Sequence, residues 1–163
     1  MKIAIIMGSD SDFPVVEKGL KILTDFGVEA DVRVLSAHRT PHLAIEYAMK
    51  AESNGIELII GAAGKAAHLP GVLAGVTPLP VIGLPILSST MDGLDSLLSI
   101  VQMPAGIPVA TVAINGAENA ALLAVQILSV KYPELREKMI AYKETLAAKV
   151  LEKDAALQAK LRG

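Results

Sequence analysis

The chain has 163 residues, 52% of them hydrophobic and 20% charged, with a formal net charge of -2 and no cysteine. This length predicts one domain, residues 1–163, with a sizeable core. The small negative charge, without a basic stripe, excludes nucleic acid as the main partner, and the lack of cysteine excludes disulfides and thiolate chemistry.

The chain contains no uninterrupted apolar run of about 18 residues, so we expect no membrane segment. Its first residues, Met1 to Met7, form too short a run for a signal peptide, and we expect a cytoplasmic protein. The apolar composition is high for a soluble chain, which predicts that part of the surface is buried against other subunits.

Short apolar runs alternate with amphipathic runs along the chain. The predicted strands cover residues 2–7, 29–35, 57–61, 80–85 and 108–114. The predicted helices cover residues 12–26, 41–53, a short segment after a loop at 62–71, 94–102, 117–130 and 133–161. This alternation predicts βαβ units and a parallel sheet that is covered by helices on both faces.

The last predicted helix differs from the others because it carries most of the late Lys and Glu residues. Its apolar residues form a stripe at helical spacing, namely Leu135, Met139, Tyr142, Leu146 and Val150. Such a helix needs a partner surface. Because the faces of the sheet already have helices, we expect residues 133–163 to contact another subunit, with packing on their own sheet as the alternative.

The loop after the first strand, Gly8 to Asp12, is suited to binding a phosphate group. Ser9 and Ser11 offer hydroxyl groups, and the following helix offers its positive end. Asp12 could accept hydrogen bonds from sugar hydroxyls. The alternative is an ordinary helix-capping turn, in which Ser and Asp are common. A metal site on Asp10 and Asp12 is disfavoured because no third ligand is near.

The stretch from Ser36 to Pro41 follows the second strand and ends with Thr before Pro, which marks a helix start. Arg39 suits a phosphate oxygen, and His38 offers an imidazole, the side-chain type most used for proton transfer near neutral pH. Ligands of open α/β sheets bind beyond the carboxyl ends of the strands, where this stretch lies. The alternative is a structural loop histidine. A metal pair of His38 with His42 is disfavoured because Pro41 starts a helix between them.

The segment from residue 62 to residue 71 is rich in Ala and Gly, which let backbone N–H groups approach a ligand closely. His68 in this loop fits a core histidine and a site histidine equally well. Lys65 is the only charged residue between Glu57 and Asp92. It must therefore reach solvent or meet an anion.

Four motifs occur together in this chain: Gly8 to Asp12, Ser36 to Pro41, Ala66-Ala67-His68-Leu69-Pro70-Gly71, and Asp95 to Pro104. In order and spacing they resemble the PurE family of purine biosynthesis, from residue 1 to about residue 132, with a looser resemblance beyond. The resemblance implies a flavodoxin-like three-layer α/β/α fold with a five-stranded parallel sheet and an extended C-terminal helix. It also implies a homo-octamer and no metal, biotin, flavin or nucleotide cofactor.

The resemblance is to the mutase class of the family. The carboxylase class has Lys after the loop histidine and lacks the Ala-Ala-His-Leu-Pro-Gly run, so Arg39 and His68 carry this assignment. The implied reaction converts N5-carboxyaminoimidazole ribonucleotide to 4-carboxy-5-aminoimidazole ribonucleotide without ATP. Alternatives are a carboxylase that uses aminoimidazole ribonucleotide (AIR) and carbon dioxide directly, a flavin- or nucleotide-binding module, and a non-catalytic phosphate sensor.

Transferred by position, the resemblance implies that Ser9, Ser11 and Arg39 hold the substrate phosphate. It implies that Asp12 binds the ribose hydroxyls. These roles agree with the donors that the two loops offer and would place both loops at one end of a substrate.

The resemblance also implies that Ser36 and His38 stand over the reacting carboxylate and imidazole, with His38 as the proton shuttle. The opposite wall is implied to consist of backbone groups of Ala63, Gly64 and Lys65 together with His68 and Leu69. A reference pKa of about 6.5 lets a histidine exist in both protonation states at working pH.

The family usually has Gly where this chain has Lys65. If the backbone there needs a positive φ, a Lys costs about 1 kcal/mol. Otherwise its amine could pair with the substrate carboxylate or with a neighbouring subunit, and we expect such a pairing.

Overall fold

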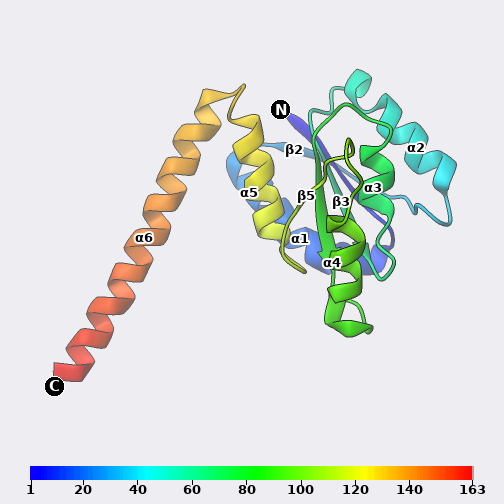
Figure 1. Cartoon of the computed structure of the whole chain (residues 1–163). Coiled ribbons are helices and arrows are strands. Elements are labelled where there is room, and N and C mark those ends of the chain that lie inside the picture. The colour runs from blue at the N-terminus through cyan, green and yellow to red at the C-terminus, as the bar shows by residue number, and fades with distance from the viewer. Residues whose placement is uncertain (163) are drawn as a thin grey trace. The chain divides into compact units, whose positions relative to one another are not determined.

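A computed structural model describes residues 1–162 of the chain (Figure 1). The strands are β1 (Lys2–Met7), β2 (Glu29–Val34), β3 (Ile59–Gly64), β4 (Val81–Ile86) and β5 (Ala110–Thr111). The helices are α1 (Phe13–Phe26), α2 (Pro41–Lys50), α3 (Leu69–Ala74), α4 (Leu94–Val101), α5 (Ala117–Leu128) and α6 (Pro133–Arg162). The chain forms two compact units, Met1–Ala124 and Val125–Gly163, and Gly163 itself lies outside the described residues. The prediction of one domain stays a prediction.

The strands of the first unit form one parallel sheet in the order β2-β1-β3-β4-β5. Strand β1 lies at the point where the chain reverses direction across the sheet, and its Ile5 pairs with Val32 of β2 and Ile60 of β3. This is the strand order of flavodoxin-like doubly wound folds. The predicted fold class is therefore confirmed.

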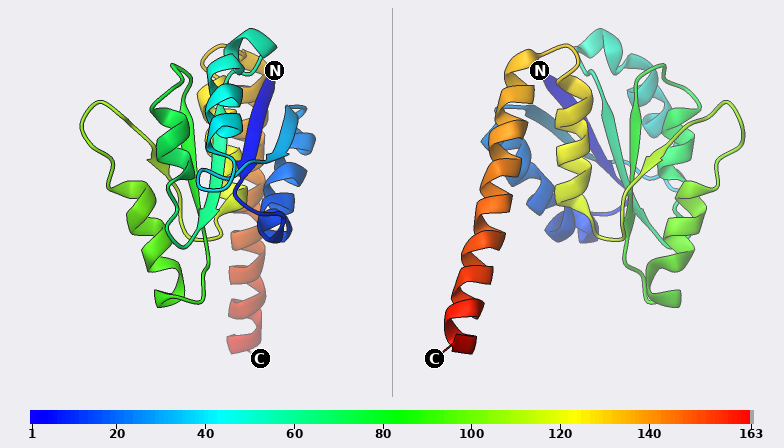
Figure 2. Two further views of the ribbon diagram at one scale, coloured as in Figure 1. Left: turned by 90° about the vertical axis from the view of Figure 1, so that its right-hand side faces the viewer. Right: turned by 60° about the vertical axis from the view of Figure 1, so that its left-hand side comes forward.

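Alternate residues of the central strands are buried on opposite faces of the sheet. On one face Ala4 and Ile6 join a buried cluster that includes residues of α2, α3 and α4. On the other face Ile5 lies with Val16 of α1 and Ala117 at the start of α5. Figure 2 shows α3 and α4 on one side of the sheet and α1 on the other. Both faces are covered, which explains why the central strands have no polar side.

Strand β3 is displaced along the sequence from its predicted position at residues 57–61. The residues Ala62 to Gly64, which the sequence placed in a loop, pair with Leu84 to Ile86 of β4. In the sequence, a run of such small residues is typical of a ligand-binding loop. In the fold the neighbouring strands provide hydrogen-bond partners, so β3 continues to Gly64 and ends at the carboxyl-terminal side of the sheet, next to the cavity loops.

Strand β5 is shorter than the predicted 108–114 and has only the two residues Ala110 and Thr111. Pro108 has no N–H to donate, and β5 pairs with β4 alone because it is an edge strand. Beyond it the chain turns at Asn115, whose φ is 57°. The prediction of a seven-residue strand here was therefore too long.

Helix α1 ends where the sequence predicts, whereas α2 and α5 end earlier than predicted. Helix α1 ends at Gly27, whose φ of 78° closes the helix in the left-handed conformation. Helix α2 ends at Lys50 and not at Ser53, because the chain continues as a short 3-10 helix over Glu52–Asn54. Helix α5 ends at Leu128, two residues before the predicted end.

The second unit consists of the end of α5 and the 30-residue helix α6. Of the predicted apolar stripe, Leu135 and Met139 are buried, whereas Leu146 and Val150 are 45% and 65% exposed.

None of the helices within residues 1–162 is long and apolar enough to cross a membrane.

Candidate active site

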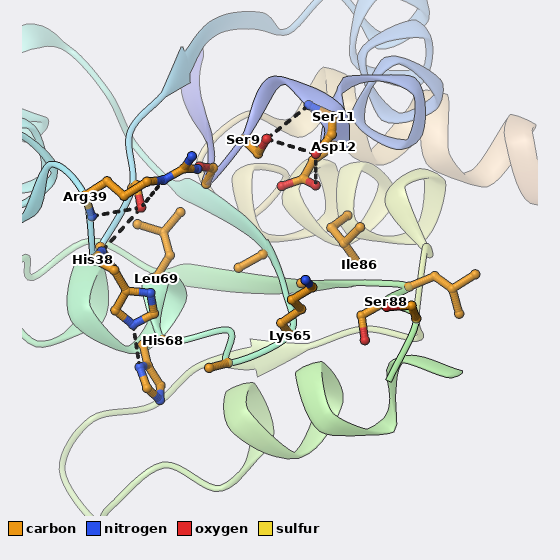
Figure 3. Close-up of a pocket in the computed structure, with 18 residues that line it drawn as sticks. Ser9, Ser11, Asp12, His38, Arg39, Lys65, His68, Leu69, Ile86 and Ser88 are labelled. Atoms are coloured by element: carbon orange, nitrogen blue, oxygen red, sulfur yellow. Dashed lines mark hydrogen bonds between the residues drawn. The ribbon is translucent and has the colours of Figure 1, made fainter. Parts of the chain in front are cut away.

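A cavity of about 680 Å³ lies at the carboxyl ends of β1, β2, β3 and β4 (Figure 3). Every residue that the sequence assigned to the site lines it: Ser9, Ser11, Asp12, Ser36, His38, Arg39, Ala63, Gly64, Lys65, His68 and Leu69. They come from loops far apart in the chain. They meet because parallel strands end at one edge of the sheet, where doubly wound folds bind ligands.

The loop after β1 forms a cluster of hydroxyl groups in front of α1. The Ser9 hydroxyl accepts hydrogen bonds from the N–H of Ser11 at 3.3 Å and from the Ser11 hydroxyl at 2.9 Å. Asp12 occupies the N-cap position of α1 but makes no capping hydrogen bond with its side chain. The end of α1 that faces the cavity thus combines hydroxyl donors with the positive end of a helix, an arrangement that suits an anion.

Asp12 is a buried carboxyl in this otherwise open loop, with only 7% of its surface exposed. Burial raises the pKa of Asp12 above its ordinary value, and the hydrogen bond from the Ser11 hydroxyl opposes this shift. Since burial disfavours the charged form, Asp12 is kept at a cost to stability near neutral pH. A residue kept at such a cost fits a role in ligand binding.

Replacing Asp12 with Asn is expected to raise the free energy of unfolding at pH 7 by about 0.5–1 kcal/mol, because it removes a buried charge. The folded-state pKa is raised above 3.8, so the carboxyl favours folding below that value and this contribution is lost as the pH rises through the folded-state pKa. The advantage of Asp12→Asn should therefore appear above about pH 4. Urea unfolding between pH 3.5 and 7 measures it.

The exposed neighbour Asp10 supplies the control, and Asp10→Asn should raise stability at pH 7 less than Asp12→Asn does, because it removes an exposed charge that acts on Asp12 only from a distance. An Asp12→Asn variant that is no more stable than the wild type at pH 7 would contradict the cost assigned to this carboxyl.

The loop after β2 is built around Ser36. Its hydroxyl accepts hydrogen bonds from the N–H groups of His38 at 3.3 Å and Arg39 at 3.1 Å. The Thr40 hydroxyl accepts the Ser36 N–H at 2.9 Å and donates to the Ser36 carbonyl at 3.2 Å, so it does not cap α2. The Ser36 hydroxyl therefore holds the loop that presents His38 and Arg39. Its contact with a reacting carboxylate stays a prediction.

Arg39 joins this loop to the loop after β1. One terminal nitrogen of its guanidinium donates to the Gly8 carbonyl at 2.6 Å, and its Nε donates to the Ser36 hydroxyl at 3.4 Å. The guanidinium is thereby held beside the hydroxyl cluster of Ser9 and Ser11. Its planar donors match the geometry of phosphate oxygens, so the two loops can hold one anion together.

His38 and His68 are in direct contact, although the sequence analysis placed them on opposite walls. His38 Nε2 lies 2.8 Å from His68 Nδ1, and the rings meet edge to face with centroids 4.9 Å apart. One nitrogen must donate and the other accept, so one proton lies between the two rings. Such a pair can hold a proton and orient the His38 ring.

Close packing of α3 on β3 positions His68. Gly61 of β3 contacts Pro70 of α3, and a Cβ at Gly61 would lie 3.1 Å from the Pro70 Cα atom. The missing side chain lets the start of α3 approach the sheet. His68 precedes this helix directly, while Leu69 in its first turn is buried and forms part of the cavity wall.

The sequence analysis missed a fourth wall, which is formed by Ile86 at the end of β4 and by Leu87, Ser88 and Ser89 in the loop that follows. The Ser88 hydroxyl donates to the Asp95 carboxylate at 2.9 Å. Asn115 supports this loop from behind, because its Oδ1 accepts the Leu87 N–H at 2.9 Å and its own N–H donates to the Pro85 carbonyl at 2.8 Å. The run of small polar residues after the fourth strand was the available signal.

The described part of the chain contains no group of three His, Asp or Glu side chains that could hold a metal ion. His42, the residue whose pairing with His38 at a metal was disfavoured from the sequence, does not line the cavity. The chemistry that the cavity itself offers is anion binding and proton transfer.

The chain resembles several curated proteins over nearly its whole length. The N5-carboxyaminoimidazole ribonucleotide mutase of Pyrococcus horikoshii is 60% identical over 96% of this chain and 88% of that protein. The proteins of the same name from Thermotoga maritima and Mycobacterium tuberculosis H37Rv are 56% and 55% identical to this chain. Each match spans 96% of this chain, and the matches span 92% and 90% of the two relatives.

Solved structures agree with this similarity. The crystal structure of Treponema denticola PurE superposes with a TM-score of 0.88 at 34% identity, over 96% of this chain and 98% of that chain. A type II dehydroquinase from Propionibacterium acnes, at 12% identity and a TM-score of 0.52 over 79% of this chain and 98% of that chain, shares the fold alone. The model of the family described as AIR carboxylase matches residues 2–149. The chain therefore belongs to the AIR carboxylase, or PurE, family.

Proposed function

We propose that this chain is a mutase of purine biosynthesis that moves a carboxylate within one molecule, from N5-carboxyaminoimidazole ribonucleotide to 4-carboxy-5-aminoimidazole ribonucleotide, without ATP. In reaction class it is an intramolecular transferase, an isomerase. The observation that carries the proposal is a single cavity with the anion-holding pair of Arg39 and Ser9 beside the contacting histidines His38 and His68. The similarity to curated mutases supports it.

One end of the cavity is assigned to the phosphoribosyl group. Ser9, Ser11 and Arg39 bind the phosphate, for which they offer two hydroxyl groups and a guanidinium next to the N-terminus of α1. Asp12 accepts hydrogen bonds from the ribose hydroxyls. These assignments leave the base of the substrate to extend toward His38.

The other end is assigned to the chemistry, with His38 as the proton shuttle. The His38 imidazolium gives a proton to the carbamate nitrogen as the bond from that nitrogen to the carboxylate carbon breaks, and carbon dioxide is released. Ring carbon C4 then attacks the carbon dioxide, and neutral His38 takes the C4 proton. The proton count balances over the cycle, so a single imidazole serves as acid and then as base.

The remaining wall keeps the released carbon dioxide from water. Ala63 and Leu69 are buried apolar residues, and Gly64 lets the backbone approach the substrate. A dry wall reduces loss of a reactive intermediate to solvent. His68 holds the His38 ring through their shared hydrogen bond.

The test is conversion of N5-carboxyaminoimidazole ribonucleotide by the purified protein with no ATP present. We expect the 4-carboxy product to form without lag. Product formed only from AIR and carbon dioxide would overturn the mutase assignment in favour of a carboxylase. Binding without turnover would indicate a phosphate-sensing scaffold, and a bound yellow chromophore would indicate a flavin module.

The assembly is proposed to be a homo-octamer located in the cytoplasm. Helix α4 supports a subunit contact, because Leu94, Leu98 and Val101 are 41%, 45% and 49% exposed and lie on one helical stripe. The exposed Leu146 and Val150 of α6 support a second contact. Light scattering of the purified protein should report eight chain masses, whereas a monomer mass would contradict this assembly.

A further inference from the structure

Lys65 has a backbone conformation that disfavours most residues other than glycine. Its φ is 56°, in the left-handed region, at the point where the chain leaves β3 after Gly64. Lysine has no local means of offsetting this, in contrast to Asn, whose short polar side chain bonds with the nearby backbone. The backbone here needs a glycine-like turn, and the sequence nevertheless places a long cation in it.

The Lys65 side chain lines the cavity, and Figure 3 shows its amine directed into the pocket. It makes no hydrogen bond or ion pair with any other residue in the part of the chain that the structure describes. Arg39, by contrast, is tied to the Gly8 carbonyl and to Ser36. Lys65 is thus a cation of the cavity whose donors are all available to a ligand.

The charges that line the cavity favour a ligand with two anionic groups. Arg39 and Lys65 are the permanent cations among the lining residues, and Asp12 is the carboxylate. The cations come from different loops, Arg39 after β2 and Lys65 after β3. If Arg39 holds a phosphate with the hydroxyl cluster, Lys65 is left for a second anion elsewhere in the same cavity.

We infer that Lys65 binds the carboxylate that is transferred, and that it is the residue by which the site distinguishes carboxylated ligands from AIR. The inference rests on the proposed function. An ammonium group would pair with the carboxylate both on the carbamate nitrogen and on C4, and it would not pair with the neutral carbon dioxide between them. Because the ion pair is present in the bound substrate and weakens as the carboxylate becomes carbon dioxide, it lowers KM and does not raise kcat.

The experiment measures binding of the 4-carboxy product and of AIR by calorimetry to the full-length protein. The variants are Lys65→Met, which removes the charge at similar length, Lys65→Arg, which keeps the charge, and Lys65→Gly, which removes the charge and suits a positive φ. A hydrogen-bonded charge pair changes affinity by about 10- to 100-fold, so Lys65→Met and Lys65→Gly should weaken product binding by about that factor. AIR binding should change less than about twofold because AIR lacks the carboxylate.

Further measurements separate the effect of the Lys65 charge from the effect of its backbone conformation. Lys65→Arg should retain most of the affinity for the product. Lys65→Gly should raise Tm by about 2–4 °C because it relieves the backbone, whereas Lys65→Met should not. The KM for N5-carboxyaminoimidazole ribonucleotide should rise in the uncharged variants with a smaller change in kcat.

An equal loss of product and AIR affinity in Lys65→Met would show that the side chain shapes the pocket, and it would overturn the inference. If the wild type is active and both uncharged variants bind the product as tightly as it does, the inference is overturned as well, while the mutase proposal stays intact. Failure of the wild type itself to convert the carbamate would instead overturn the proposed function.

Discussion

Replacing His38 with Asn is expected to lower kcat by about 10²- to 10⁴-fold, the factor that a positioned acid-base group contributes. Asparagine is polar and of similar size but cannot exchange a proton near neutral pH. Binding of the 4-carboxy product should stay within a few-fold of the wild type, because Arg39 and the hydroxyl cluster are untouched. Steady-state kinetics with the carbamate substrate and calorimetry with the product measure the two effects.

His42→Asn is the matched control for this variant. His42 lies at the start of the neighbouring helix α2, on the same loop-helix segment, and it does not line the cavity. We expect wild-type turnover from it. Full activity in His38→Asn would remove His38 from the reaction and would leave His68 as the remaining histidine of the cavity.

Replacing Arg39 with Lys is expected to raise the KM for the phosphorylated substrate by about 10- to 100-fold, since a charge-assisted pair contributes about 1.5–3 kcal/mol. The positive charge is kept, but the planar donors that hold the Gly8 carbonyl and an anion at once are lost. The value of kcat should fall less, because the group sits at the phosphate end of the cavity. Substrate-dependence curves measure both constants.

Arg33→Lys is the control for the Arg39 variant. Arg33 is an exposed arginine of β2 that pairs with Asp31 at 2.8 Å and does not line the cavity. It should leave KM and kcat unchanged. A KM in Arg39→Lys equal to the wild-type value, together with unaltered competition by inorganic phosphate, would place the phosphate elsewhere.

Local sequence determined the order of elements and the position of the site loops. Some signals act over only a few residues, namely apolar runs of strand length, Pro41 at a helix start and Gly27 at a helix end. Their effects can therefore be predicted without knowledge of the tertiary structure. Ser9, Arg39 and Lys65, which the family resemblance placed in one site, line one cavity although they are far apart in the chain. They meet because parallel strands in βαβ units end at the same edge of the sheet.

Long-range pairing decided the features that the sequence analysis missed. Strand β3 runs to Gly64 because β4 offers a partner there, and β5 has only two residues because it pairs at an edge. Asn115 reaches the loop at Leu87 from 28 residues away, and His38 contacts His68 across 30 residues. Neither contact leaves a local pattern, because each depends on the packing of separate βα units.

Lys65 illustrates the division between the two sources of information. The sequence alone posed a choice between a strained backbone and an amine that pairs with an anion. The structure shows that the left-handed φ and the cavity-facing amine occur together. The φ of a single residue is set by the chain on both sides, here the end of β3 and the start of α3, so only the tertiary structure could decide it.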